Sequence, residues 1–377
     1  MTNPNAWDQS QRDDRRNHSY LQKPWQQLQD DAIPELTPVL AQVKSVLEES
    51  IERPAGIPCG KTAIFTAKVM CYPRQNDKRN RTNAMILHRH KVLLSLIYDV
   101  NRCVSDIELT KWAFLIRHEH ESRGGSAFYE FVPYLYGPFS FSLNQEAGKL
   151  VEKGLLTCPS EKTWASASGS LSYRPDQLSQ RGVNWVLDRF SDHSADDLMD
   201  YVYSRYPQYT VHSKRKKLAQ KIAAEPAVYT AGYEGLSVDG FLYRLIDRGI
   251  RHLIDVRHNP IARRFGFHKS TLNRLCESLG IRYSHVPSLG IHSSQRQELD
   301  SQGDYDSLFA IYRSTTLKRE TDSIRQVSEW ITESPSVLVC MEADPCTCHR
   351  THLAAAVAKE TGLPVVDLGT EINDRIT

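Results

Sequence analysis

The sequence predicts an α/β protein in which a Rossmann-like domain with a parallel sheet follows a mainly α-helical, winged-helix-like domain. Strand and helix patterns alternate from residue 227 to the end of the 377-residue chain, and this alternation is typical of a parallel sheet covered by helices. Residues 85–210 carry apolar residues at helical spacing, followed by a hairpin pattern. Residues 1–84 show no sustained pattern of either kind, so the chain divides into a leader and two folded parts.

Residues 1–84 are predicted to be a disordered or weakly ordered leader. The stretch from Trp7 to Asp31 is rich in Gln, Asp, Arg and Asn, and it has too few apolar residues to offset the entropy of ordering. One short helix is expected between Pro38 and Ile51, where apolar residues recur at helical spacing. A downstream translation start is the alternative explanation for this segment.

Residues 85–210 are predicted to form the winged-helix-like domain. An apolar stripe from Leu87 to Val100 predicts a first helix, and the capping residues Ser105 and Ser140 precede two more. The expected elements after them are a β-hairpin from Leu155–Cys158 to Leu171–Arg174 and helices near Gln177–Phe190 and Ser194–Tyr206.

The charge of this helical domain leaves its role open. It carries 13 Lys and Arg against 15 Asp and Glu, a balance of −2, whereas DNA-binding modules usually present a basic face. We therefore weigh DNA binding equally with a protein partner or homo-oligomer formation through this domain. Residues 211–226 are predicted to be a basic linker, because Val211–Lys221 contains five Lys or Arg in eleven residues.

The overall composition excludes several classes of protein. The chain has 47 Lys and Arg against 45 Asp and Glu, so its net charge of +2 excludes a uniformly basic, histone-like binder. No apolar run approaches the ~18 residues of a membrane helix, and the first residues lack the basic and apolar regions of a secretory signal. The spacing of the eight cysteines suggests no disulfide framework, which favours a reducing, cytoplasmic location.

Residues 227–377 contain the alternating elements of the α/β domain. Strands are expected at 228–230, 252–257, 281–286, 336–340 and 364–368, and helices at 237–249, 270–279, 306–318, 322–332 and 351–361.

This domain resembles the family called domain of unknown function 488 (DUF488) across residues 227–370. The matching segments are Gly232–Gly235, Asp255–Pro260, Phe265–Lys269, Leu289–Gly290, Cys340-x-Glu342 and Cys348–Arg350. The resemblance implies the α/β fold but no activity, because the family's name records none. The Asp-Val-Arg strand and the later Cys/Arg loop also look distantly like a rhodanese, by analogy only. The helical domain resembles the one found ahead of certain such α/β domains and, more loosely, antitoxin-type domains with a Tyr-Gly-Pro segment.

Polar residues follow the predicted strands, where an open parallel sheet binds its ligands. We therefore expect one polar crevice that binds phosphate. A phosphate is expected at the start of the helix that follows Cys348, held by Arg257, Lys269 and Arg350. The expected crevice residues are Tyr233, Glu234, Asp255, Arg257, Asn259, Lys269, Glu342, Cys348, His349 and Arg350.

A basic stretch accompanies this crevice. Eight Lys or Arg against two Asp lie between Arg244 and Arg274, a local charge of +6 with Phe265, Phe267 and His268 among them. Arg263 and Arg264 are expected to bind a nucleic-acid backbone, while the aromatic rings stack on a base. A solvated basic loop is the alternative.

Cys348 has three interpretations. Beside His349 and Arg350 at a helix start, its thiol would tend toward a thiolate nucleophile, with His349 as proton carrier. Alternatively, the residue is packed and only its neighbours bind ligand. The third interpretation is a zinc site, whose candidate ligands are Cys340, Cys346, Cys348, His349 and His352.

Glu234 beside Tyr233 offers a different chemistry. A Glu in an anion-binding crevice could attack or stabilise a sugar carbon during cleavage of an N-glycosidic bond. A structural role is the alternative, with Glu234 paired to an arginine and Tyr233 packed in its turn. The leading hypothesis is thus an enzyme directed at nucleic acid or a nucleotide. A rhodanese-like sulfur or phosphoryl transferase and a non-enzymatic sensor of nucleotides or modified DNA, in defence or regulation, are the alternatives.

Overall fold

The computed structural model describes residues 86–369, apart from residues 168, 170, 297 and 298. The predicted leader of residues 1–84 lies outside the described residues. All described residues belong to one compact unit, which spans Arg81–Thr377.

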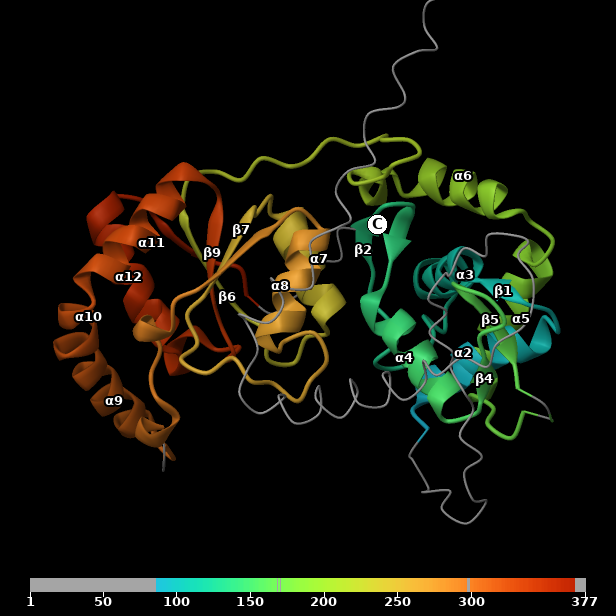
Figure 1. Cartoon of the computed structure of the whole chain (residues 1–377), viewed down its shortest axis with the longest axis horizontal. Coiled ribbons are helices and arrows are strands. Elements are labelled where there is room, and N and C mark those ends of the chain that lie inside the picture. Colours follow the sequence, from blue (N-terminus) through green and yellow to red (C-terminus); the bar gives the residue numbers. More distant parts are fainter. Residues whose placement is uncertain (1–85, 168, 170, 297–298, 370–377) are drawn as a thin grey trace, which may run out of the picture. The chain divides into compact units, whose positions relative to one another are not determined.

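A five-stranded, all-parallel sheet organises the carboxyl-terminal part of the chain and confirms the predicted α/β class (Figure 1). The strand order is β10-β6-β9-β7-β8, and every neighbouring pair is parallel. The three central strands are buried along their whole length, as expected for strands covered on both faces. The strands are β6 (Val228–Gly232), β7 (His252–Asp255), β8 (Arg282–His285), β9 (Ser336–Cys340) and β10 (Val365–Asp367).

Helices cover both faces of this sheet (Figure 1). Helices α7 and α8 share one apolar core with it, whereas α11 and α12 form a second core on the other face. Helices α9 and α10 follow β8, and Phe309 and Tyr312 of α9 belong to a smaller apolar cluster. The helices are α7 (Val238–Asp247), α8 (Lys269–Ser278), α9 (Gln302–Ser314), α10 (Thr316–Arg319), α11 (Thr321–Glu333) and α12 (His349–Thr361).

The strand order creates a switch point beside β9. Strand β9 lies between β6 and β7, and the chain leaves β6 toward α7 on one face but leaves β9 toward α12 on the other. Because the strands are parallel, their carboxyl ends meet at one edge, which we call the carboxyl edge. Open parallel sheets bind ligands at such an edge.

The residues ahead of this sheet build a separate apolar core around α3. The predicted caps are confirmed, because the hydroxyls of Ser105 and Ser140 each accept the backbone N–H three residues further on. The helices are α2 (His88–Asp99), α3 (Asp106–Glu119), α4 (Phe141–Glu152), α5 (Gln177–Phe190), α6 (Ala195–Arg205) and the 3-10 helix η4 (Pro207–Thr210).

A small antiparallel sheet accompanies these helices, with strand order β1-β5-β4. Its strands are β1 (Val104–Ser105), β4 (Leu156–Thr157) and β5 (Thr163–Ser166). The predicted return strand at Leu171–Arg174 is wrong. The return strand is β5, whose Trp164 is buried in the helical core, whereas Leu171 only packs against that core and residues 172–174 are exposed. The winged-helix assignment stays a prediction.

The aromatic segment before α4 forms a short hairpin that the sequence patterns did not predict. Strands β2 (Val132–Tyr134) and β3 (Gly137–Phe139) pair antiparallel across a two-residue turn. Val132 packs in the core of the α/β sheet rather than in the helical core. The side chain of Asp239 on α7 in turn accepts the backbone N–H groups of Phe141 and Ser142 at the start of α4.

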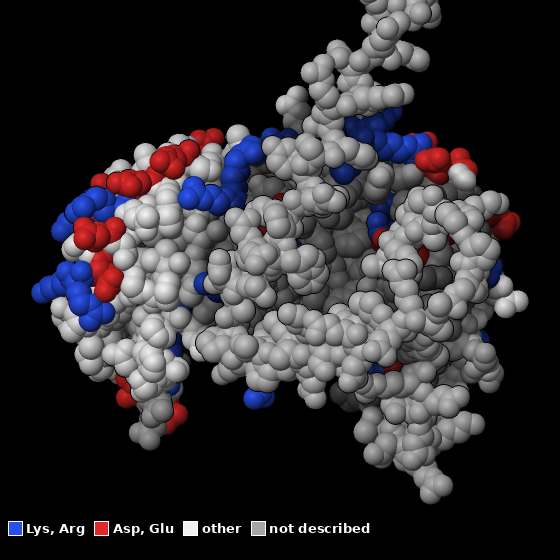
Figure 2. Space-filling model, viewed as in Figure 1, with Lys and Arg blue, Asp and Glu red and all other residues white. Residues whose placement is uncertain are grey.

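The residues between η4 and β6, including the predicted linker, contain no helix or strand. Over the described residues, no helix is both long and apolar enough to cross a membrane. On the face shown in Figure 2, Lys and Arg are interspersed with Asp and Glu over the part that carries α10 and α11.

Candidate functional site at the carboxyl edge

Four side chains with metal-binding or nucleophilic atoms converge at the carboxyl edge. Cys340 ends β9, Glu342 lies in the loop that follows, Cys348 is the N-cap of α12, and His349 is the first residue of that helix. One sulfur, nitrogen or oxygen atom of each lies within 4.8 Å of those of the others. We call these four residues the thiol centre.

The thiol centre is organised around the carboxylate of Glu342. Its Oε2 lies 2.8 Å from Sγ of Cys340 and 3.1 Å from Sγ of Cys348. Nδ1 of His349 lies 3.7 Å from Sγ of Cys340, and Nε2 lies 3.1 Å from the carbonyl oxygen of Val256. Cys340, Cys348 and His349 are each at most 2% exposed, so Glu342 provides the partly open side of the centre.

Arg296 is a member of the site that the sequence analysis missed. It follows the 3-10 helix η6 (Ser293–Gln295), in the long segment between β8 and α9. Its guanidinium pairs with Oε1 of Glu342, and Nη2 lies 2.9 Å from Nδ1 of His349. No motif marks this arginine, because only the fold brings its segment to the end of β9.

The two thiols of the centre differ in their pKa values. Burial raises the pKa of Cys340, but the hydrogen bond with Cys348 and the nearby charge of His349 lower it by more, to well below its usual value. Burial also raises the pKa of Cys348, and the hydrogen bond with Cys340 and the negative charge of Cys340 raise it further. The thiol with the lowered pKa is therefore Cys340, whereas the sequence pointed to Cys348.

A second polar cluster lies at the end of β7, and we call it the Asp255 cluster. Arg257 donates from Nε and Nη2 to the two oxygens of Asp255, at 2.8 and 2.5 Å, and from Nη1 to the hydroxyl of Tyr233 at 2.7 Å. Nη1 also lies 2.9 Å from the carbonyl oxygen of Phe267, and the hydroxyl of Tyr283 donates to Asp255. Arg257 is 6% exposed and Asp255 is fully buried. Arg257, predicted to hold phosphate, thus has its donors turned to protein partners.

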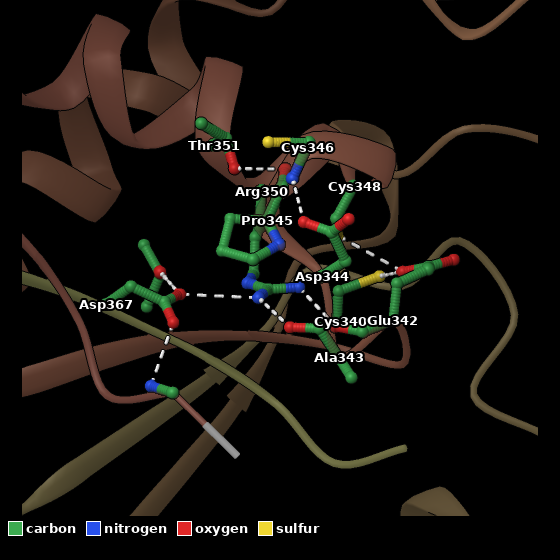
Figure 3. A network of polar contacts seen from close by, with 12 residues as sticks. Cys340, Glu342, Ala343, Asp344, Pro345, Cys346, Cys348, Arg350, Thr351 and Asp367 are labelled. Carbon is green, nitrogen blue, oxygen red and sulfur yellow. Dashed lines mark hydrogen bonds and ion pairs between the residues drawn. The ribbon is translucent and has the colours of Figure 1, made fainter. Parts of the chain in front are cut away.

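Arg350 is also engaged by the protein (Figure 3). Its side chain is fully buried, and its guanidinium donates to the carbonyl oxygens of Glu342 and Ala343 and pairs with Asp367 at 3.3 Å. These contacts fix the loop between β9 and α12. Arg350 therefore supports the loop that carries Glu342, whereas the sequence had suggested that it contacts phosphate directly.

The remaining predicted site residues are exposed. Oε2 of Glu234 accepts the backbone N–H of Ala343 at 3.1 Å, which places this carboxylate beside the thiol-centre loop. Nη2 of Arg264 lies 3.4 Å from the carbonyl oxygen of Gly235. Within the described part of the chain, neither Arg263 nor Arg264 has an acidic side chain within 4.0 Å. The exposed residues are Glu234, Asn259, Arg263, Arg264 and Lys269.

The basic stretch is divided by the fold. Arg244 and Arg257 are buried, and Arg274 lies within α8. Arg248 and Arg251 precede β7, so they lie at the opposite edge of the sheet. The exposed cations nearest the carboxyl end of β7 in the sequence are Arg263 and Arg264 in the loop and Lys269, the first residue of α8.

Two of the five suggested zinc ligands lie outside the thiol centre. Cys346 is exposed in the 3-10 helix η7 (Pro345–Thr347), and its sulfur points away from Cys340 (Figure 3). The ring of His352 packs on Phe309 with centroids 4.6 Å apart, and its Nδ1 lies 3.2 Å from Arg313. Glu342 takes their place as the fourth group beside Cys340, Cys348 and His349.

A cavity of about 270 Å³ lies away from this edge. Ile222, Tyr243, Ile250 and Leu279 contribute to its mostly apolar wall. It contains none of the residues predicted for the site.

Residues 237–357 match the family described as domain of unknown function DUF488. The carboxyl-terminal α/β part is a DUF488 domain. The matched segment of this DUF488 domain includes the Asp255 cluster from Asp255 onward and the whole thiol centre, but it begins after Tyr233 and Glu234. No curated protein and no solved structure shows significant similarity to the chain.

Proposed function

We propose that the DUF488 domain is an enzyme that acts on a nucleic acid or a nucleotide. The observation that carries the proposal is the exposed basic segment that begins beside the thiol centre. The carbonyl oxygen of Val256 contacts His349, and the segment then returns to the end of β6, where Arg264 approaches Gly235. A phosphate backbone bound by Arg263 and Arg264 would therefore lie near a thiol, carboxylate and imidazole group.

Glu234 is the group that we expect to face the substrate. It is exposed, it lies at the end of β6, and its hydrogen bond to Ala343 holds it one residue from Glu342. The thiols and the imidazole of the thiol centre, by contrast, are buried. This burial gives no support to a rhodanese-like transfer, in which the thiolate must meet a sulfur donor directly.

The helical domain would position the substrate or a protein partner. Its −2 charge balance favours a contact with protein at least as much as one with DNA. The six free cysteines among the described residues agree with a reducing location such as the cytoplasm.

The reaction is tested by incubating the full chain with pools of nucleotides and oligonucleotides and analysing the products by mass spectrometry. Release of a free base would show cleavage at the sugar, and a transferred group would show a transferase. Glu234→Gln should reduce product formation by a factor on the order of 10² or more, the usual range for a general acid or base. Glu329→Gln, at an exposed position on α11, is the matched control. If a ligand is recovered bound but chemically unchanged, the protein is a sensing module and not an enzyme.

Substrate binding is tested separately by its salt dependence. If Arg263 and Arg264 each neutralise one phosphate, the double Ala variant should flatten the slope of log K against log salt by about 1.4 to 1.8. The double variant Arg248→Ala, Arg251→Ala is the matched control, because these exposed arginines lie at the opposite edge. If both double variants gave the same slope of log K against log salt, Arg263 and Arg264 would not be phosphate contacts.

A further inference from the structure

We propose that the thiol centre binds one zinc ion, through Sγ of Cys340 and Cys348, Nδ1 of His349 and one carboxylate oxygen of Glu342. Thiolate, imidazole and carboxylate are the three ligand types of protein zinc sites, and four ligands complete a tetrahedron. The centre offers these types in one place, within 4.8 Å. The inference concerns the reaction site of the proposed enzyme, but it holds whatever the substrate is.

The orientation of His349 supports a metal ligand at Nδ1. The carbonyl oxygen of Val256 can only accept a hydrogen bond, so Nε2, 3.1 Å away, carries the hydrogen. When Nη2 of Arg296, 2.9 Å away, donates to Nδ1, that nitrogen carries no hydrogen, and it can bind a metal in place of the guanidinium. A backbone carbonyl that holds one ring nitrogen while the other faces the ligands is the usual arrangement around a metal-binding histidine.

The sulfur–nitrogen distance also agrees with a tetrahedral site. With Zn–S and Zn–N bonds of about 2.3 and 2.05 Å, sulfur and nitrogen ligands lie about 3.6 Å apart. The observed separation of Sγ of Cys340 and Nδ1 of His349 is 3.7 Å. Oε2 of Glu342 lies 2.8 and 3.1 Å from the two sulfurs, so this carboxylate would move outward by about 0.5 to 0.8 Å to reach the separation of two ligands.

The surroundings of the centre can hold the four ligands in place. Arg296 pairs with the other oxygen of Glu342, Oε1, and would keep that contact while releasing Nδ1 to the metal. Arg350 holds the carbonyl oxygens of Glu342 and Ala343, which fixes the loop between the ligands. On binding, each thiol loses its proton to solvent and contributes a sulfur lone pair, so zinc affinity would rise with pH.

Zinc content is tested on the full chain purified without metal or chelator. Elemental analysis by mass spectrometry should find about one zinc ion per chain, and cobalt loaded after removal of zinc should give the visible absorption of a tetrahedral site with thiolate charge transfer. Cys340→Ser and Cys348→Ser should each weaken zinc binding by more than 100-fold. Arg296→Ala, which removes a contact to a ligand and not a ligand, should weaken it by about 10- to 100-fold.

The matched controls lie within the same segment. Cys346→Ser and His352→Ala should bind zinc as the unaltered chain does, because neither side chain belongs to the centre. Where a serine variant fails to fold, the zinc content and the cobalt spectrum of the unaltered protein answer the question.

Three outcomes would overturn the assignment. The first is a chain that takes up no zinc, and the second is uptake that depends on Cys346 or His352. The third is iron or copper bound in preference to zinc. Because none of these measurements uses a nucleic acid, their failure is distinguishable from failure of the proposed function.

Discussion

The Asp255 cluster and the thiol centre lie at the same edge of the same sheet, at the ends of neighbouring strands, yet they differ in how their polar groups are matched. In the Asp255 cluster, the donors of Arg257 and Tyr283 meet the carboxylate of Asp255 directly. In the thiol centre, two sulfurs, a carboxylate and an imidazole nitrogen converge, with Arg296 as their cation. The first cluster pairs a carboxylate with its cation, whereas the second gathers four side chains that can each bind a metal.

This difference separates a structural network from a candidate reaction site. Residue types alone do not, because Arg and Asp at strand ends are as typical of active sites as Cys and His. Their grouping does, because two thiols, an imidazole and a carboxylate within 4.8 Å form a set of metal ligands, whereas Asp255 is already paired with a guanidinium. The predictions below test this separation, from the largest expected effect to the smallest.

Asp255→Ala should destabilise the protein strongly and leave the thiol centre intact. The change leaves the guanidinium of Arg257 buried without its charge partner, which costs about 3–5 kcal/mol of unfolding free energy. Urea unfolding of the full chain measures the loss, and zinc per folded chain should not change.

The double variant Asp255→Leu, Arg257→Met is the control for this prediction. Replacing both partners removes the unpaired charge, so it should recover a large part of the lost stability. If Asp255→Ala instead kept its stability and lost zinc or activity, the two clusters would be one site and the comparison would fail.

Asp239 sharpens the comparison, because it is a buried carboxylate whose described partners include two backbone N–H groups and no cation within 4.0 Å. Burial raises the pKa of Asp239 to about 6, from 3.8. The folded protein therefore binds a proton between pH 4 and 6 that the unfolded chain has lost. The stability that this proton contributes is complete below pH 4 and disappears as pH rises through 6.

The unfolding free energy of the protein, relative to that of Asp239→Asn, should accordingly fall by about 3 kcal/mol between pH 4 and pH 7. Asparagine does not titrate, so the variant removes this contribution and keeps one acceptor for the N–H groups of α4. Denaturant unfolding at several pH values measures the difference. A constant difference across this range would mean that solvent reaches the carboxylate.

The fold was predictable where local chemistry and periodicity agree. Strand β9 matches its prediction residue for residue, because five apolar or small residues between Pro335 and Met341 pack between two strands. The caps at Ser105 and Ser140 were equally clear. The hairpin β2–β3 could not be predicted from the sequence, because its aromatic residues show no alternation. It also packs on a sheet that begins about ninety residues later.

The site was predictable in its location and less so in its roles. Glu342, Cys348 and His349 follow from strand ends and a helix start, but the arginine that joins them, Arg296, comes from an unmarked segment. Arg350 looked like an anion ligand because it begins a helix. Only the structure shows that two carbonyl oxygens and Asp367 accept from its Nη1 and Nη2 groups.

Gly232 connects the backbone of the sheet to the thiol centre, and it gives the smallest predicted effect. It ends β6, where a Cβ atom would overlap the carbonyl group of Glu342 on the neighbouring loop. Gly232→Ala should therefore cost about 1–3 kcal/mol of unfolding free energy, as overpacking does, and should also weaken zinc binding by displacing Glu342.

Gly148→Ala is the matched control, because this helical glycine has open space around it and alanine there should stabilise α4 by about 0.5–1 kcal/mol. If Gly232→Ala lost stability but bound zinc normally, Glu342 would not be a ligand, and the thiol centre would retain only three.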